Sequence, residues 1–264
     1  MNAVKRILFA ATLLLLLVPG TAIFAQEGGV DQREFTIVPY LWAPNIKGEM
    51  TIGRQTGNVD IGADAVLDET EFAGMLQMEA RFGRFGLFVQ PNYFKLEEDQ
   101  SILQTDVDLT LKFWMIEFGG FLRLAEMGVV RTHPATYLDL LFGGRYWGIE
   151  RETEVSSTLF FTESDENVHL IEPFVGLRMA TYLTDHILFG VRGDAGGFGA
   201  KGDDVESKLT WQAITFLGYE FNTVFGIQAG YRWLSIDMEN TEVSFNNEID
   251  LDFEGPFTGL SFRF

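Results

Sequence analysis

Charged side chains recur at alternating positions in segments whose other positions are apolar. In residues 138–146, for example, Asp139 and Arg145 alternate with Leu140 and Phe142. Successive side chains of a strand point to opposite faces, so charged residues in this pattern share the polar face of a sheet. Six acids and five arginines follow this pattern: Glu79, Arg81, Glu117, Asp139, Arg145, Glu172, Arg178, Arg192, Asp194, Glu220 and Arg232. Because buried charges are costly unless paired, the pattern predicts a ladder of Arg–carboxylate ion pairs.

Residues that usually carry catalysis are sparse. The chain has three histidines, of which His133 and His186 fall in expected connectors. His169 lies near Ser156, Ser157 and Ser164, but it alternates in register with apolar residues, and no serine stands in a constrained nucleophile motif. We therefore expect no catalytic residues, no cofactor and no enzyme. The enzymatic alternative is a hydrolase or acyl-chain enzyme centred on His169.

Metal-binding patterns are also weak. The sequence has no cysteine, which excludes disulfides and thiolate metal sites. Acidic runs occur at Glu97–Asp99, at 163–166 and at 203–206, but none has the Asp-x-Asp-x-Asp-Gly spacing of a calcium loop. No dedicated metal site is expected. Converging carboxylates do bind Ca²⁺, so divalent cations are candidate partners of these acidic segments.

Composition excludes one class of partner and indicates a folded chain. With 19 basic against 38 acidic residues, the formal net charge is −19. Nucleic acid is therefore not an expected partner, because binding phosphate requires positive charge. The chain is nevertheless 47% hydrophobic and contains 25 phenylalanines, unlike disordered acidic chains.

The first 25 residues have the composition of a secretory signal peptide. Lys5 and Arg6 precede an apolar run from Ile7 to Val18, which is too short for a transmembrane helix of about 20 residues. Cleavage is expected after Ala25, with Ala22 as the alternative. Residues 1–25 are therefore predicted to be a signal peptide, and residues 26–264 a single domain.

Period-two alternation organises the rest of the chain. In 209–221, Leu209, Trp211, Leu217 and Tyr219 alternate with polar or small residues. The expected strands have about ten or more residues, enough to cross a bilayer at a tilt. Short connectors alternate with long acidic ones near 97–106, 152–167, 200–207 and 239–247. We expect ten strands: 34–43, 72–82, 85–96, 106–124, 135–151, 168–183, 187–199, 208–221, 224–238 and 248–264.

These strands predict an all-β fold, a closed antiparallel transmembrane β-barrel with both termini periplasmic. Segment 44–71 leaves a second possibility open, because residues 46–52 and 59–61 could form an extra hairpin and raise the number of strands to twelve. Residues 63–72 have the pattern of a short amphipathic helix capped by Asp64. The alternation slips near Trp114, Leu234 and Gly255–Pro256, where bulges are expected.

The C-terminal residues carry the most specific motif. Leu260, Phe262 and Phe264 alternate with Ser261 and Arg263, and the chain ends on Phe. This end resembles the signature that the barrel-assembly machinery recognises in outer-membrane barrels. With the signal peptide, and with segments such as 39–42, 142–147, 191–199 and 230–233, the chain is similar to a family of small bacterial outer-membrane β-barrel proteins of uncharacterised function. The resemblance implies residence in the outer membrane of a Gram-negative cell, with membrane lipid and lipopolysaccharide as partners.

The expected function follows from the interior and the loops. Large paired charges should nearly fill a small barrel, so we expect a structural protein or a narrow, porin-like channel that conducts weakly. Acidic loops at its mouth should favour cations. The alternative is a surface-binding barrel that uses its acidic extracellular loops.

Overall fold

A computed structural model of the chain describes residues 33–52, 55–102, 105–130, 133–157, 161–202, 205–240 and 248–264. The expected signal peptide lies outside these residues, as do Asp203 and Asp204. The described elements are β1 (Arg33–Trp42), β2 (Asn45–Ile52), β3 (Gln55–Ile61), α2 (Ala63–Glu69), β4 (Thr70–Phe82), β5 (Phe85–Ile102), β6 (Thr105–Val130), β7 (His133–Ser157), β8 (Phe161–Tyr182), β9 (Ile187–Lys201), β10 (Val205–Glu220), β11 (Phe225–Asn240) and β12 (Glu248–Arg263).

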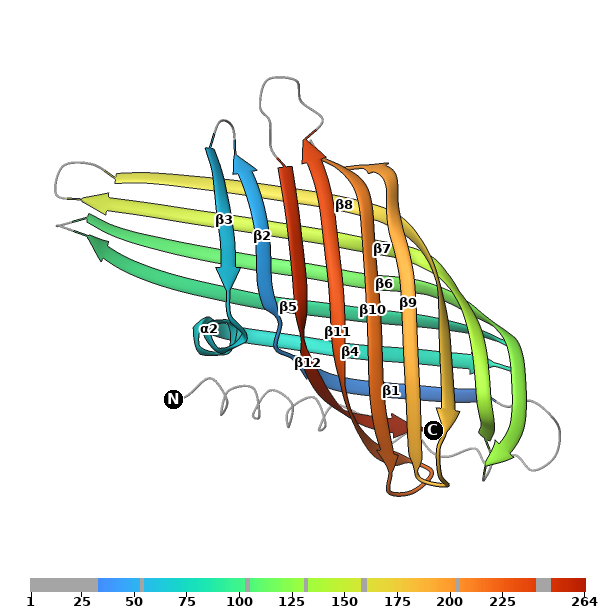
Figure 1. Ribbon diagram of the computed structural model, residues 1–264. Coiled ribbons are helices and arrows are strands. Elements are labelled where there is room, and N and C mark those ends of the chain that lie inside the picture. Colours follow the sequence, from blue (N-terminus) through green and yellow to red (C-terminus); the bar gives the residue numbers. More distant parts are fainter. Residues whose placement is uncertain are drawn as a thin grey trace.

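Ten of these strands close into an antiparallel barrel. The order runs from β1 through β4, β5 and onward to β12, and β12 pairs again with β1. The closing seam joins Tyr40 to Gly259, and it ends in two backbone hydrogen bonds between Phe35 and Phe264. Figure 1 shows the two walls crossing at a steep angle, with β4–β8 in one and β9–β12 in the other. The predicted ten-stranded barrel is confirmed.

The hairpin β2–β3 is an addition to the closed ring. After Pro44 the chain continues as β2, which pairs with residues Glu248–Glu254 of β12, the same strand that pairs with β1. Strand β3 then pairs with the other edge of β2. The twelve-strand alternative was therefore right about the hairpin but not about the size of the ring. Helix α2 follows. It is shorter than predicted because Thr70 already begins β4, and Asn45 accepts a hydrogen bond from the Ala63 amide at 2.9 Å.

The two ends of the barrel differ. At the end that holds Arg33 and Phe264, the strands are joined by short turns at 83–84, 183–186 and 221–224. We call this the turn end and the opposite one the hairpin end. At the hairpin end, β5 and β6 extend to Ile102 and Thr105, and β7 and β8 to Ser157 and Phe161. The predicted acidic loops near 97–106 and 152–167 are therefore mostly strand. The connector predicted at 125–134 was also wrong, because β6 continues to Val130.

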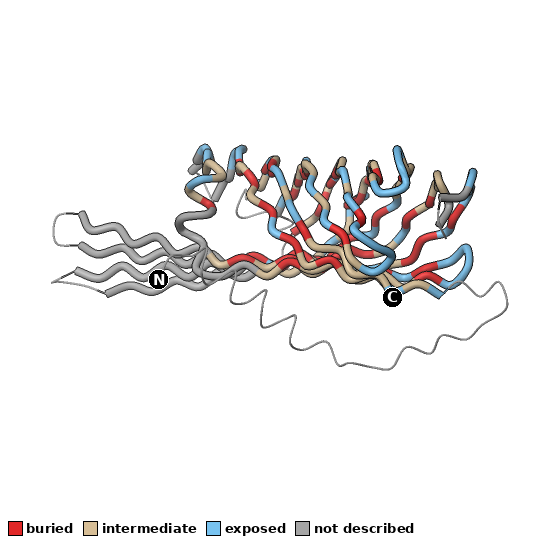
Figure 2. Tube along the Cα trace, turned by 90° about the horizontal axis from the view of Figure 1, so that it is seen from below, coloured by how far each residue is buried: buried red, intermediate tan, exposed pale blue. Residues whose placement is uncertain are grey.

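The outer face of the barrel is apolar. Side chains at least 50% exposed on this face include Phe82, Leu87, Ile171, Leu177 and Leu217. Figure 2 shows exposed and buried residues alternating along the same strands. Among the described residues, no helix has the length and apolar character needed to cross a membrane.

Candidate functional site: the barrel interior

The centre of the interior is an ion cluster built around Arg145. Its guanidinium contacts Glu117 at 2.6 Å, Glu172 at 3.1 Å and Asp194 at 2.6 Å, and all four side chains are fully buried. The sheet brings three of them together, because Glu117 on β6 and Glu172 on β8 lie directly opposite Arg145 on β7. Gln212 adds donors to Glu117 and Asp194. The charges are thus both paired and hydrogen-bonded, which buried charges require.

A second cluster ties the two walls together nearer the turn end. Arg178 on β8 donates to both carboxylate oxygens of Glu79 on β4, at 2.5 and 3.1 Å, and to Asp139 at 2.8 Å. Arg123 also donates to Asp139, at 2.8 Å. Because β4 and β8 are not neighbours in the sheet, the Arg178–Glu79 pair spans the interior.

A third cluster lies at the turn end itself. Arg263 contacts Glu220 at 2.9 Å and Glu34 at 3.6 Å, and Arg81 contacts Glu34 at 3.2 Å. Tyr182 donates a hydrogen bond to Glu220 at 2.6 Å. Glu34 and Arg263 are partly exposed while Arg81 and Glu220 are buried, so the cluster forms a charged rim.

All eleven charged residues singled out in the sequence lie in the interior, and nine of them belong to these three clusters. Arg192 borders the central cluster through Asp194 at 2.8 Å and Glu117 at 3.4 Å, and Arg232 is the eleventh. Sequence reasoning missed Arg123, Glu34 and Arg263, which belong to the same network. Alternation alone could have found Arg123, because it stands six residues after Glu117 on the same face of β6.

Arg232 differs from the other interior arginines. It is 1% exposed, yet its nearest acid is Glu117 at 3.8 Å. Its guanidinium lies 4.8 Å over the ring of Trp42, and its Nη2 approaches the sulfur of Met115 at 3.6 Å. Its Nε and Nη1 have no hydrogen-bond partner among the described residues. Arg232 is therefore a buried cation that is only partly neutralised.

Above the central cluster, toward the hairpin end, the interior becomes apolar. Met115 and Trp147 are fully buried there, and Leu234, Ile236 and Met238 are 1–2% exposed. They belong to one cluster, here called the apolar layer: Val38, Tyr40, Trp42, Ile46, Val66, Met75, Phe94, Phe113, Met115, Trp147, Leu170, Val205, Leu234, Ile236, Met238, Leu251 and Phe253. The predicted polar lumen therefore describes only the middle and the turn end of the interior, and sequence reasoning missed the apolar layer.

The apolar layer also explains why the expected bulges were wrong. Strand pairing runs without a register shift through Trp114, Leu234 and Gly255. At these points the inward-facing positions become apolar. The apolar residues therefore shift from odd to even positions, or the reverse, although the strand itself has no bulge. The register shifts fall instead at 70–72, 123–125 and 207–209.

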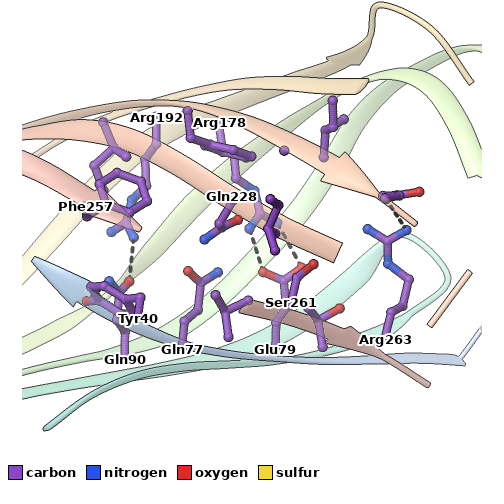
Figure 3. A pocket seen from close by; sticks show the side chains of 18 of the residues that line it. Tyr40, Gln77, Glu79, Gln90, Arg178, Arg192, Gln228, Phe257, Ser261 and Arg263 are labelled. Carbon is purple, nitrogen blue, oxygen red and sulfur yellow. Dashed lines mark hydrogen bonds and ion pairs between the residues drawn. The ribbon is translucent and has the colours of Figure 1, made fainter. Parts of the chain in front are cut away.

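Between the central cluster and the turn-end rim lies a cavity of about 140 Å³. Figure 3 shows Tyr40, Gln77, Glu79 and Gln90 on one side of it and Arg178, Arg192, Gln228 and Phe257 on the other. Leu188, Ile214 and Phe216 add apolar surface to the wall, and Glu34, Glu220, Arg232 and Arg263 add further charges.

Two other expected sites can be placed. His169 lies outside the interior, stacked on Tyr146, with the tyrosine hydroxyl 2.9 Å from its Nδ1. The side chains of Ser156, Ser157 and Ser164 lie outside the described residues. Within the described part of the chain, no group of three His, Asp or Glu residues is arranged to hold a metal ion.

A closed antiparallel barrel with an apolar exterior and an ion-paired interior has the architecture of a membrane-spanning barrel of the outer-membrane type. The sequence matches no protein-family model and no curated protein.

Three solved structures are similar to this chain in fold. The outer-membrane protease OmpT from Escherichia coli is 8% identical at a TM-score of 0.48, over 91% of this chain and 99% of that chain. The toluene transporter TbuX from Ralstonia pickettii is 8% identical at 0.41, over 89% and 90%. The attachment invasion locus protein Ail of Yersinia pestis is 11% identical at 0.36, over 89% and 100%. At such identities and TM-scores, their activities are not transferred to this chain.

Proposed function

We propose that this chain is an integral barrel of the outer membrane whose interior is closed, so that its role is structural or, at most, that of a narrow, weakly conducting channel. The observation that carries the proposal is the apolar layer stacked on the central ion cluster. Met115, Trp147 and Arg145 each have no exposed surface. An ion would have to leave its water to cross such a layer, which costs far more than thermal energy.

The outer face supports placement in a bilayer. Aromatic side chains that favour the membrane–water boundary gather at two levels. Tyr93 packs on Trp114 and Tyr231 on Trp233 toward the hairpin end, and Tyr219 packs on Phe221 at the turn end. Membrane lipid and lipopolysaccharide are the proposed partners of this face. Delivery by a signal peptide and insertion by the barrel-assembly machinery belong to the same proposal, with the turn end in the periplasm.

Cation preference, if ions pass, would come from the hairpin end. On the outer face beyond Trp233, Asp237 lies directly opposite Asp250, which in turn lies opposite Glu49. Like charges in register are destabilising. An acidic mouth concentrates cations.

The same row of acids favours the second candidate function, a barrel that binds a cationic partner at its outer surface. Opposed acids such as Asp237 and Asp250 lower the stability of the sheet, so a binding function would explain why they are there. An enzyme centred on His169 has less support, because that side chain faces outward beside Tyr146.

Planar-bilayer recording tests the main proposal. Wild-type protein should give no steps or only small ones with a preference for cations. Replacing Arg145 and Arg178 with alanine should not open a wide pore, because the apolar layer remains. Adding Trp147→Ala and Leu234→Ala should raise the conductance. Large, anion-selective steps from the wild type would contradict a closed interior.

A further inference from the structure

The cavity near the turn end contains two arginines in one cross-strand row. Arg192 on β9 and Arg232 on β11 both lie opposite Ile214 on β10, and all three residues line the cavity. Strands lie about 4.8 Å apart, so the two arginine backbones are separated by roughly 10 Å, with Ile214 between them. Long side chains at that spacing can reach a common ligand.

Both arginines have hydrogen-bonding capacity that the protein does not use. Among the described residues, Arg192 Nη2 has no acceptor, and neither do Nε and Nη1 of Arg232. Arg192 has Asp194 at 2.8 Å, but Arg232 has only Glu117, whose Oε2 lies 3.4 Å from Arg192 and 3.8 Å from Arg232. Buried polar groups in native proteins are nearly always satisfied, so unmet donors point to an absent partner.

The charges around the cavity favour an anion. Its lining includes four arginines, Arg178, Arg192, Arg232 and Arg263, against three acids, Glu34, Glu79 and Glu220. Arg178 engages Glu79 through both oxygens, and Arg263 contacts Glu34 and Glu220. Arg192 is paired with Asp194, and Arg192 and Arg232 share the deeper Glu117, so what these two arginines offer a ligand is their unused N–H donors.

The size and lining of the cavity restrict the rest of the ligand. A volume of about 140 Å³ resembles that of cavities that accept a benzene-sized molecule. Phe216, Phe257 and Leu188 supply apolar surface, while Gln90 and Gln228 supply neutral polar groups. A solute that matches both the arginines and the apolar surface has one acidic group and a short apolar body.

We propose that this cavity binds a small organic carboxylate of about the size of benzoate, with its carboxylate held between Arg192 and Arg232 and its apolar body against Phe216 and Phe257. Arginine suits this role because its planar fork of donors matches the two oxygens of a carboxylate. The site lies below the closed part of the interior, so it does not require a pore.

Titration calorimetry on the refolded full chain in detergent, with benzoate as the probe, tests the site. Wild-type protein should bind benzoate, and it should bind benzamide, which has a similar shape but no charge, at least about tenfold more weakly. Inorganic phosphate should also bind more weakly, because it leaves the apolar surface uncovered. Arg232→Gln should reduce benzoate affinity by about tenfold or more.

A second variant keeps the test informative if Arg232→Gln does not fold. Ile214→Phe fills the space between the arginines and leaves both charges in place, so it should also abolish binding. Ile171→Phe is the matched control, since Ile171 is 59% exposed on the outer face. Equal binding of benzoate and benzamide, tighter binding of phosphate, unchanged affinity in folded Arg232→Gln or Ile214→Phe, or no binding by the wild type would each overturn the proposal.

Discussion

At Arg145, acids from three strands converge on one guanidinium in the middle of the barrel. Glu117, Glu172 and Asp194 are each fully buried, and Arg145 is the cation that all three contact. Such a cluster stabilises the fold less than its number of contacts suggests, since every ion first loses its water. Removing Arg145, however, would leave three buried carboxylates without their shared counter-ion.

Arg145→Met should therefore lower the free energy of unfolding by about 3–5 kcal/mol. Urea unfolding in lipid vesicles, followed by tryptophan fluorescence, measures the change. Lys201→Met is the control: Lys201 is 68% exposed and its pair with Glu206 is on the surface, so the loss should be below about 1 kcal/mol. Equal losses in the two variants would show that the Arg145 cluster does not hold the walls together.

Alternation was sufficient to place the charged residues inside but not to pair them. The Arg178–Glu79 pair joins strands that are not adjacent, and no local pattern encodes which residues meet across the interior. The three acids around Arg145 were likewise recognised singly, while their shared partner follows from register. Register depends on turn lengths and shifts such as that at 123–125, which the sequence pattern does not reveal.

At the scale of elements, β12 is the strand on which closure depends. It pairs with β11 along its whole length, with β2 at its beginning and with β1 at its end. Its terminal Phe264 is 59% exposed and bonds through its backbone to Phe35. The expected assembly signal therefore lies where the ring closes.

Phe264→Asp should strongly reduce the yield of membrane-inserted barrel, read as the fraction that migrates differently on gels before and after boiling. Phe221→Asp is a matched change, because Phe221 is 52% exposed at the same end but belongs to the β10–β11 turn. A general loss of apolar surface would affect both variants alike. Equal yields would remove the special role assigned to the last strand.

The β2–β3 hairpin should behave as an independent addition to the ring. Gly48 has a φ of +149°, and a Cβ there would collide with the carbonyl oxygen of Asp250 on β12. Gly48→Val should speed amide hydrogen exchange in 45–61 while the barrel keeps its gel shift. Gly193→Val on the outer face of β9, where a Cβ has room, should change neither. Loss of the whole barrel in Gly48→Val would contradict the separation of hairpin and ring.

The strand periodicity was a reliable guide where the inward face was polar, and it failed where the inward face became apolar. Leu209 to Phe221 was readable because Thr210 and Gln212 face inward. From Leu234 to Met238 the inward positions are the apolar Leu234, Ile236 and Met238, while the outward positions 235 and 237 are polar, so the polar side chains change face and the expected bulge was an error of interpretation. The acidic segments near 97 and 152 were taken for loops because runs of charged residues are typical of loop sequences, whereas the backbone there is in strands β5 and β7.

At the scale of the whole molecule, the barrel is organised along its axis. A charged rim and a cavity occupy the turn end, the Arg145 cluster the middle, and the apolar layer the hairpin end. This order predicts that water enters from the turn end and stops at the central cluster. The closed interior that we propose would suit a structural or binding role better than transport.

Cysteine accessibility tests this order most directly, because the chain has no cysteine of its own. Single cysteines at Ser261, which lines the cavity, and at Leu234, which is 1% exposed in the apolar layer, would be treated with a water-soluble thiol reagent in folded protein. Ser261→Cys should react quickly, and Leu234→Cys should react only after unfolding. Equally fast labelling of both positions in the folded barrel would show a continuous aqueous path and contradict the closed interior.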